Sequence, residues 1–270
     1  MTQLRTIVAG AGGRMGAANI RAVAAEAGLV LVGAVDRAGA SAIGKDAGSL
    51  AGIEALGVHV SDDLDALLDG ADVIIDFTAP AASVALARRA AAKGLVHIIG
   101  TTGCSEADDA AIGEAAASGA RVVKSGNFSM GVVLLASLVR KAAAALPGYD
   151  IEVLEMHHNR KVDAPSGTAL LLGNAAAAGR EISLKDKAVY AREGHTGARE
   201  AGTIGFATLR GGTVVGDHTV MLAGPSERIE LTHRAEDRAI FANGAVRAAI
   251  WAAGQPAGLY SMADVLGLND

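Results

Sequence analysis

A glycine-rich run near the start of the chain limits the possible folds more than any other feature. Residues 4–9 read LRTIVA, an apolar stretch typical of a buried strand, and residues 10–16, GAGGRMG, follow at once. A helical pattern then extends to about residue 27, and residues 29–35, LVLVGAV, form a second apolar stretch. This order of strand, glycine-rich turn, helix and strand predicts a βαβ unit with parallel strands.

The same unit predicts a dinucleotide site. Glycines in such a turn permit a tight bend and a close approach of the backbone to a pyrophosphate, whose charge is favoured by the first helix amides. The third glycine is Gly16 rather than residue 15, which departs from the usual spacing. The turn residues expected to bind the cofactor are Gly10, Ala11, Gly12, Gly13, Arg14 and Met15.

Two residues after the second strand bear on the choice of dinucleotide. Asp36 lies 20 residues after Gly16, where a carboxylate can accept hydrogen bonds from the adenosine ribose hydroxyls. Arg37 beside it could meet a 2′-phosphate, so NADH or NADPH remains open. The glycines alone could be turn formers, but the flanking strands, the helix and the acid favour dinucleotide binding.

Strands and helices continue to alternate as far as residue 128. Apolar strands are expected at 72–77, 95–99 and 120–124, separated by helices that begin near residues 80 and 105. This alternation predicts an α/β, Rossmann-like, doubly wound parallel sheet whose ligands bind beyond the carboxyl ends of the strands. The residues expected there, in the nicotinamide half of the groove, are Thr78, Gly100, Thr101, Thr102, Ser125, Gly126, Asn127 and Phe128.

The chain changes character after a helix expected at residues 130–146. Strand-like runs then recur without a helix between most of them, which predicts a second α+β domain with an open mixed sheet. One face would cover helices and the other would pack on a second subunit. We expect a dinucleotide-binding domain of residues 1–128 and 239–270, and a substrate-binding and oligomerisation domain of residues 129–238. The runs are 149–156, 188–191, 203–209, 213–222 and 228–232.

A second candidate site lies in residues 155–168, EMHHNRKVDAPSGT. Four basic side chains fall within five positions at the expected end of a strand: His157, His158, Arg160 and Lys161. Ser166 is a good N-cap for a helix over residues 167–179, so the amides of Gly167 and Thr168, in its first turn, would suit an anion. A core histidine beside a solvated one is the alternative, but two anion-binding devices in one place favour a site for a small dicarboxylate.

A nicotinamide beside such a site predicts hydride transfer completed by a proton. His157 suits the general acid because imidazole titrates near neutrality. Lys161 could hold a carboxylate or assist the proton transfer, and the amides of Gly167 and Thr168 could hold another carboxylate.

Composition excludes several other classes of protein. The net charge of −5 leaves no basic stripe for nucleic acid, and no apolar run reaches the roughly 20 residues that a membrane span needs. The start of the chain lacks a signal-peptide pattern, so we expect a cytoplasmic enzyme. Cys104 is the single cysteine, which excludes an intramolecular disulfide and a cysteine zinc site, and no metal is expected. A buried thiol is favoured over a nucleophile for Cys104.

Eight stretches of the sequence, in order, resemble one family. They read GAGGRMG (10–16), DFT (76–78), GTTG (100–103), GNFSMGV (126–132), HHNRKVDAPSGTA (157–169), GTIGFATLRGG (202–212), GDHTVMLAG (216–224) and FANGAVRAAIW (241–251). Together they resemble the dihydrodipicolinate reductases of bacterial lysine biosynthesis over essentially the whole chain. The resemblance implies reduction of 4-hydroxy-tetrahydrodipicolinate, or its dehydrated form, to tetrahydrodipicolinate with NADH or NADPH. It also implies a homotetramer assembled through the sheet of the second domain.

The resemblance also implies roles for individual residues. His157 would be the proton donor and Lys161 a second donor and substrate binder, while His158, Gly167 and Thr168 would bind substrate. Residues 10–15, Asp36, residues 100–102 and residues 125–128 would bind the cofactor. Asp36 stands where a glutamate is expected, and Cys104 replaces an aromatic residue after GTTG.

Two other functions fit part of the pattern. A regulatory protein that senses the dinucleotide without turnover would need a partner surface but no acid at His157. An amino-acid or aldehyde dehydrogenase could share the two-domain build, but an acylating one would need a nucleophilic cysteine.

Overall fold

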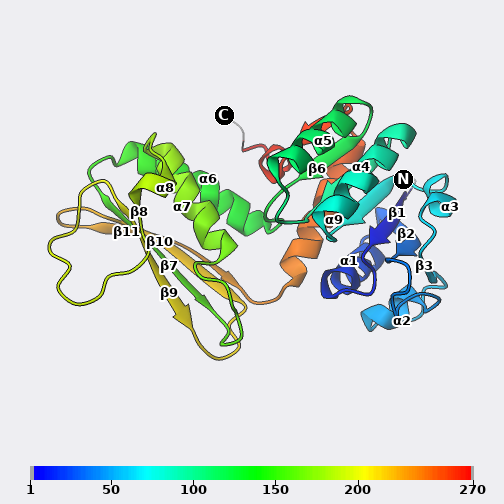
Figure 1. The fold of residues 1–270 in the computed structure, drawn as a ribbon, viewed down its shortest axis with the longest axis horizontal. Helices are drawn as coiled ribbons and strands as arrows, with labels where there is room; N and C mark the ends of the chain where they lie inside the picture. The colour runs from blue at the N-terminus through cyan, green and yellow to red at the C-terminus, as the bar shows by residue number, and fades with distance from the viewer. Residues whose placement is uncertain (1–2, 269–270) are drawn as a thin grey trace. The chain divides into compact units, whose positions relative to one another are not determined.

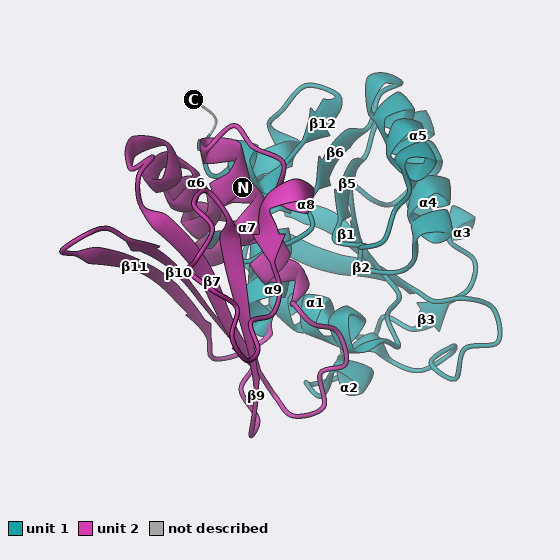
Figure 2. Ribbon diagram, turned by 60° about the vertical axis from the view of Figure 1, so that its left-hand side comes forward, with its two compact units in different colours: residues 1–130, 239–270 teal, residues 131–238 magenta. Residues whose placement is uncertain are grey.

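The computed structural model describes residues 3–268, which form two compact units (Figures 1 and 2). Unit 1 contains the described residues up to Met130 and from Ala239 onward, and unit 2 is Gly131–Arg238. The last long helix of the chain therefore belongs with the first half of the sequence rather than with the segment that precedes it.

Unit 1 is built on a sheet of seven parallel strands in the order β12-β6-β5-β4-β1-β2-β3. The chain moves outward from β1 in one direction and returns to its other side at β4, so β1 and β4 flank the topological switch point where such sheets bind ligands. The strands are β1 (Leu4–Ala9), β2 (Leu29–Val35), β3 (Val60–Ser61), β4 (Val73–Asp76), β5 (Val96–Ile99), β6 (Arg121–Lys124) and β12 (Gly258–Tyr260).

Helices cover both faces of this sheet, which explains why its central strands read as continuous apolar runs. All four residues of β4 and of β5 are buried. Helices α4 and α5 pack together on one face, and α1 and α9 on the other (Figure 1). The helices are α1 (Arg14–Ala25), α2 (Ala47–Ala51), α3 (Asp65–Leu68), α4 (Pro80–Lys93), α5 (Glu106–Ala117), α9 (Ala239–Ala253) and α10 (Met262–Val265).

Unit 2 is a mixed sheet in the order β11-β10-β7-β9-β8 with helices on one face (Figure 2). Strand β7 pairs parallel with β9 and antiparallel with β10. Inward-facing residues of β7, β9 and β10 pack against α6 and α7 in one apolar core. The elements are α6 (Met130–Ala145), β7 (Asp150–His157), α7 (Gly167–Gly179), α8 (Leu184–Lys187), β8 (Ala188–Val189), β9 (Ile204–Arg210), β10 (Gly216–Ala223) and β11 (Arg228–Ala235).

The predicted fold class, a Rossmann-like parallel sheet plus a second unit with a mixed sheet, is confirmed. Three details differ from the expectation. The Gly/Ser-rich stretch after Arg37 has no clear period in the sequence but contains α2, and the tail adds β12 to the edge of the parallel sheet. The run expected at 213–222 begins as a strand only at Gly216, because the carbonyl of Val214 accepts from the amide of His158 instead of joining the ladder. Across residues 3–268, no helix is both long enough and apolar enough to cross a membrane.

Candidate functional site

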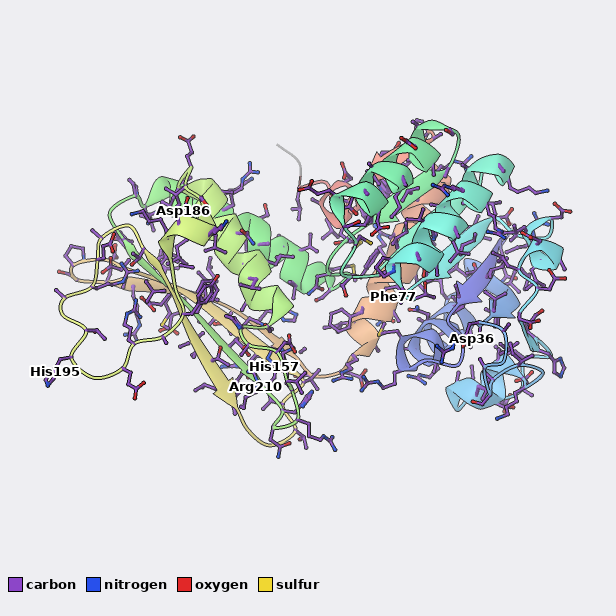
Figure 3. The ribbon with its side chains drawn as sticks, in the orientation of Figure 1. Asp36, Phe77, His157, Asp186, His195 and Arg210 are labelled. Atoms are coloured by element: carbon purple, nitrogen blue, oxygen red, sulfur yellow. The ribbon has the colours of Figure 1, made fainter. Side chains whose placement is uncertain are left out.

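A cavity of about 670 Å³ opens at the carboxyl ends of β1, β2 and β4 in unit 1. Five residues expected to bind the dinucleotide line it: Gly10, Gly12, Gly13, Asp36 and Arg37. Thr78 and Phe77, at the end of β4, form another part of the wall, and Arg89 of α4 adds a second guanidinium. Figure 3 shows Asp36 and Phe77 among the side chains of this unit.

The glycine turn is tightly packed against the start of α1. Gly10 has φ +71°, which favours glycine, and its carbonyl accepts from the amide of Gly13 at 2.9 Å. A Cβ on Gly16 would lie only 2.1 Å from that carbonyl oxygen, so the helix can approach the turn only with glycine there. The unusual position of the third glycine therefore serves the same close packing of helix on turn.

The carboxylate of Asp36 is fixed beside this turn. One oxygen accepts from the amide of Gly12 at 2.8 Å, and the other accepts from the amide of Arg37 at 2.8 Å. These bonds hold a negative charge at the cavity wall while leaving lone pairs for the hydroxyls of a ribose.

The remaining turn residues contribute differently. Ala11 is buried and its amide bonds the carbonyl of Val35, whereas the side chain of Arg14 is exposed and that of Met15 is half-buried. Among the described residues, these three are outside the lining of the cavity.

The strand ends predicted to face the nicotinamide hold a buried polar network. The Asp76 carboxylate accepts from the amide and hydroxyl of Thr78 at 3.0 and 2.6 Å and lies 3.3 Å from His97 Nε2. The hydroxyl of Thr101 accepts from the amide of Thr78 at 3.0 Å and from Ser83 at 2.8 Å. Burial opposes ionisation of Asp76, but hydrogen bonds from His97 and its neighbours hold its pKa below the ordinary value.

Gly100, Thr102 and residues 125–128 occupy the neighbouring strand ends. Gly100 lies against the ring of Phe77, where a Cβ would come within 2.2 Å, while Thr102 is exposed. Ser125 donates to the carbonyl of Asn127, and Gly126 is exposed. The ring of Phe128 is buried and tilted against the ring of Phe77, with 5.5 Å between the ring centroids, so this side chain belongs to the core.

In unit 2 the end of β7 places His157 on the same face as the apolar core, because residues at alternate positions of a strand share a face. Its Nδ1 lies 2.6 Å from Glu155 Oε2, and the carboxylate is 1% exposed. The paired position on β9 is Arg210, whose guanidinium binds both oxygens of Glu155 at 2.8 and 2.9 Å. Figure 3 shows His157 and Arg210 together at this end of the sheet. Burial opposes ionisation, but Arg210 and His157 keep the pKa of Glu155 below its ordinary value.

The loop after β7 carries the other predicted residues. The Lys161 ammonium donates to both oxygens of Asp163 at 2.8 Å, which lowers the pKa of that carboxyl. The His158 Nδ1 accepts from the amide of Arg160, and its Nε2 lies 3.4 Å from Arg238. Desolvation and the charges of Arg238 and Arg160 lower the pKa of His158, which favours a neutral ring.

Helix α7 begins next to this cluster, as the sequence predicts. Ser166 is the N-cap, with its hydroxyl accepting from the amide of Ala169 at 3.1 Å and its own amide donating to Glu155 at 3.1 Å. Gly167 is exposed and Thr168 half-buried at the first turn, where helix amides attract an anion. His157, Lys161 and the α7 start thus all belong to the polar end of one sheet face.

The sequence did not predict several buried polar residues of these two candidate sites. Glu155 and His157 stand two apart on a strand, a spacing that could have suggested their pairing. The partners of this pair, Arg210 and His218, come from distant strands and carry no local signal. The contact between the buried side chains of Asp76 and His97 likewise joins two separate strands and has no local signal in the sequence.

The sequence predicts neither a nucleophilic Cys104 nor a metal site. Burial raises the pKa of the Cys104 thiol, which disfavours the thiolate that a nucleophile needs. Within residues 3–268, no group of three or more histidine, cysteine, aspartate or glutamate side chains could hold a metal ion.

Comparison with known proteins gives matches over the whole chain. Profiles described as dihydrodipicolinate reductase, N-terminus and C-terminus match residues 4–128 and 131–266. A 4-hydroxy-tetrahydrodipicolinate reductase of Rhodopseudomonas palustris (strain BisA53) is 61% identical, covering 100% of this chain and 99% of that one. A 4-hydroxy-tetrahydrodipicolinate reductase of Brucella abortus (strain 2308) is 59% identical, covering 97% of this chain and 98% of that one. A dipicolinate-bound dihydrodipicolinate reductase from Paenisporosarcina sp. TG-14 has a TM-score of 0.78 at 22% identity, covering 96% and 98%, and supports the fold.

Proposed function

The chain belongs to the dihydrodipicolinate reductase family, and we propose that it is an oxidoreductase that reduces 4-hydroxy-tetrahydrodipicolinate to tetrahydrodipicolinate. This reaction belongs to diaminopimelate and lysine biosynthesis, and its substrate is a small dicarboxylate. The observation that carries the proposal is the His157 imidazole, held by Glu155 at 2.6 Å beside the start of α7.

The residues of unit 1 fit a nicotinamide dinucleotide. The glycine turn and the start of α1 can take the pyrophosphate, and Asp36 can take the adenosine ribose. When bound, the cofactor supplies the hydride. Asp36 suits the ribose diol of NADH and Arg37 the 2′-phosphate of NADPH, so we propose that both are used.

The residues of unit 2 would bind the diacid and complete the reduction. Lys161 and His158 would hold one carboxylate, and the amides at Gly167 and Thr168 the other. His157 would then give its Nε2 proton to the atom next to the one that receives the hydride, since Nδ1 is engaged by Glu155. Lys161 is the second candidate donor.

We propose further that the protein is a cytoplasmic homotetramer assembled through unit 2. The sheet face opposite α6 and α7 carries Leu209, 47% exposed, and the half-buried side chains of Leu154, Met156 and Met221. Apolar side chains on a sheet face without covering helices, next to the ion pair of Glu152 and Arg192, suit contact with a second copy of the chain. Light scattering of the purified protein tests this assignment, and a monomer would exclude it.

Activity is tested by following the absorbance of NADH and NADPH with substrate made freshly by coupled synthesis. A panel of 2-oxo acids and aldehydes serves as the control. We expect oxidation of the cofactor only with the cyclic diacid. Tight binding of NADH without turnover of any substrate would instead indicate a dinucleotide-sensing regulatory protein.

A further inference from the structure

The carboxylate of Glu155 contacts three separate elements of unit 2. On β7 it lies 2.6 Å from Nδ1 of His157. At the start of α7 it accepts from the amide of Ser166 at 3.1 Å, and on β9 it accepts from both terminal guanidinium nitrogens of Arg210. A buried carboxylate with so many donors has little freedom to move, so the groups that it binds are fixed relative to one another.

We propose that Glu155 is a positioning residue that orients His157 for proton donation, holds the start of α7 directly, and holds the Lys161 loop through Arg210. The proposal rests on the reductase function above. Because the carboxylate can only accept, the His157 nitrogen that faces it must carry a hydrogen. The neutral imidazole is thereby held as the Nδ1–H tautomer, and Nε2 is the nitrogen that gives up a proton and takes a new one.

Arg210 extends the arrangement to the loop. Besides its two bonds to Glu155, it donates to the backbone carbonyl of Asp163 at 2.7 Å. The side chain of that same residue holds the ammonium of Lys161. A displacement of Glu155 would therefore move the loop that carries Lys161 as well as the imidazole.

The opposite face of β7 provides a matched control. Glu152 also forms a two-bond ion pair, with Arg192 at 2.9 and 2.8 Å, and a further bond with Arg199 at 3.1 Å. It lies on the same strand but on the sheet face away from His157. Loss of Glu152 should affect folding in the way that loss of any such ion pair does, without touching the acid.

The test compares Glu155→Gln with Glu152→Gln in the full chain, using 15N NMR of the His157 ring, assigned with a His157→Gln spectrum. Glutamine keeps the shape but presents an amide group that can donate to the imidazole or face the Arg210 donors. We expect Glu155→Gln to populate the Nε2–H tautomer and to lower kcat by roughly tenfold to a hundredfold. NADH affinity should stay unchanged, and Glu152→Gln should keep the tautomer, kcat and KM.

A Glu155→Gln protein that loses stability but keeps the Nδ1–H tautomer and kcat would overturn the proposal, because the carboxylate would then be structural only. If that variant fails to fold, Arg210→Lys decides. A lysine keeps the charge but lacks the planar guanidinium that binds Glu155 and the Asp163 carbonyl at the same time. The loop that carries Lys161 should therefore be held less firmly, so KM should rise more than kcat falls. Unchanged KM and kcat in Arg210→Lys would contradict the proposal. The tautomer is measured without substrate, so a wild-type protein without turnover would refute the reductase function but leave this measurement valid.

Discussion

The hydroxyl of Ser166 lies 2.8 Å from Nε2 of His218, which brings the N-cap of α7 against strand β10. This hydroxyl accepts from the amide of Ala169, so its O–H can donate a hydrogen bond to Nε2 of a neutral His218 ring. The ring of His157 lies edge-on to His218, with 5.1 Å between centroids. The two histidines therefore have different surroundings: one faces a carboxylate and the other a hydroxyl.

This difference predicts a pH dependence of stability. Burial, followed by the charge of His157, lowers the pKa of His218 from 6.5 to about 4. The unfolded chain thus binds a proton that the folded chain does not bind between these values. The His218 contribution is fully present above pH 6.5 and is lost as the pH falls toward 4, by up to about 3 kcal/mol.

Replacing His218 with glutamine should flatten this dependence. Denaturant unfolding at several pH values between 4 and 7 measures the free energy of unfolding of each protein, and His195→Gln in an exposed loop is the control. We expect the control to follow the wild type. If His218→Gln retains the full wild-type slope, His218 is not the group responsible.

The proposed acid is tested by His157→Gln. Glutamine keeps a polar side chain near Glu155 but cannot deliver a proton, so kcat should fall by roughly a hundredfold or more. NADH affinity, measured by fluorescence titration, should not change because the residue belongs to unit 2. An unchanged kcat would remove His157 from the acid role and leave Lys161 as the donor.

Asp36 and Arg37 should separate the two cofactors. Asp36→Ala removes the carboxylate proposed to bind the ribose and should weaken NADH binding by roughly tenfold to a hundredfold, since a hydrogen bond to a charged group contributes about 1.5–3 kcal/mol. Arg37→Ala should weaken NADPH binding while sparing NADH. Titration of each variant with both cofactors measures this. A normal NADH Kd in Asp36→Ala would reject the ribose contact, and equal losses in Arg37→Ala would reject the phosphate contact.

The sequence predicted the parallel sheet well because its signals are local. Each buried strand is a short apolar run followed directly by its turn and helix. The apolar run of the strand and the helical spacing of apolar residues can both be recognised within about 15 residues. The strand β12 was not predicted, because the three residues Gly258–Tyr260 are too few to show a periodic pattern. Its pairing with β6 also joins positions that are far apart in the chain. A helix was likewise missed at α2, whose cap, Asp46, also binds the amides of residues 56 and 57.

In the candidate site, too, local features could be predicted and contacts between distant residues could not. The cluster from His157 to Lys161 could be recognised because its residues are adjacent. The spacing of Glu155 and His157 is a local signal for their pairing, but the other donors to Glu155, Ser166 and Arg210, lie 11 and 55 positions further along the chain and could not be predicted. A buried carboxylate is defined by such distant partners, which only the folded sheet brings together.

The last prediction concerns the glycine turn, where a glycine-to-alanine change affects packing and helix propensity in opposite directions. Gly16 and Gly113 both lie within helices of unit 1, α1 and α5, so an alanine favours the helical backbone at either position by about 0.5–1 kcal/mol. At Gly16, however, the new Cβ would lie 2.1 Å from the carbonyl oxygen of Gly10 and 2.8 Å from Cα of Ala11, whereas at Gly113 it meets open space. Gly16→Ala should therefore push α1 away from the turn, lower the free energy of unfolding by about 1–3 kcal/mol and weaken NADH binding. Gly113→Ala should be neutral or stabilising and bind NADH normally. Thermal unfolding and NADH titration of both variants measure the contrast, and wild-type NADH affinity in Gly16→Ala would mean that the approach of α1 to the turn does not shape the dinucleotide site.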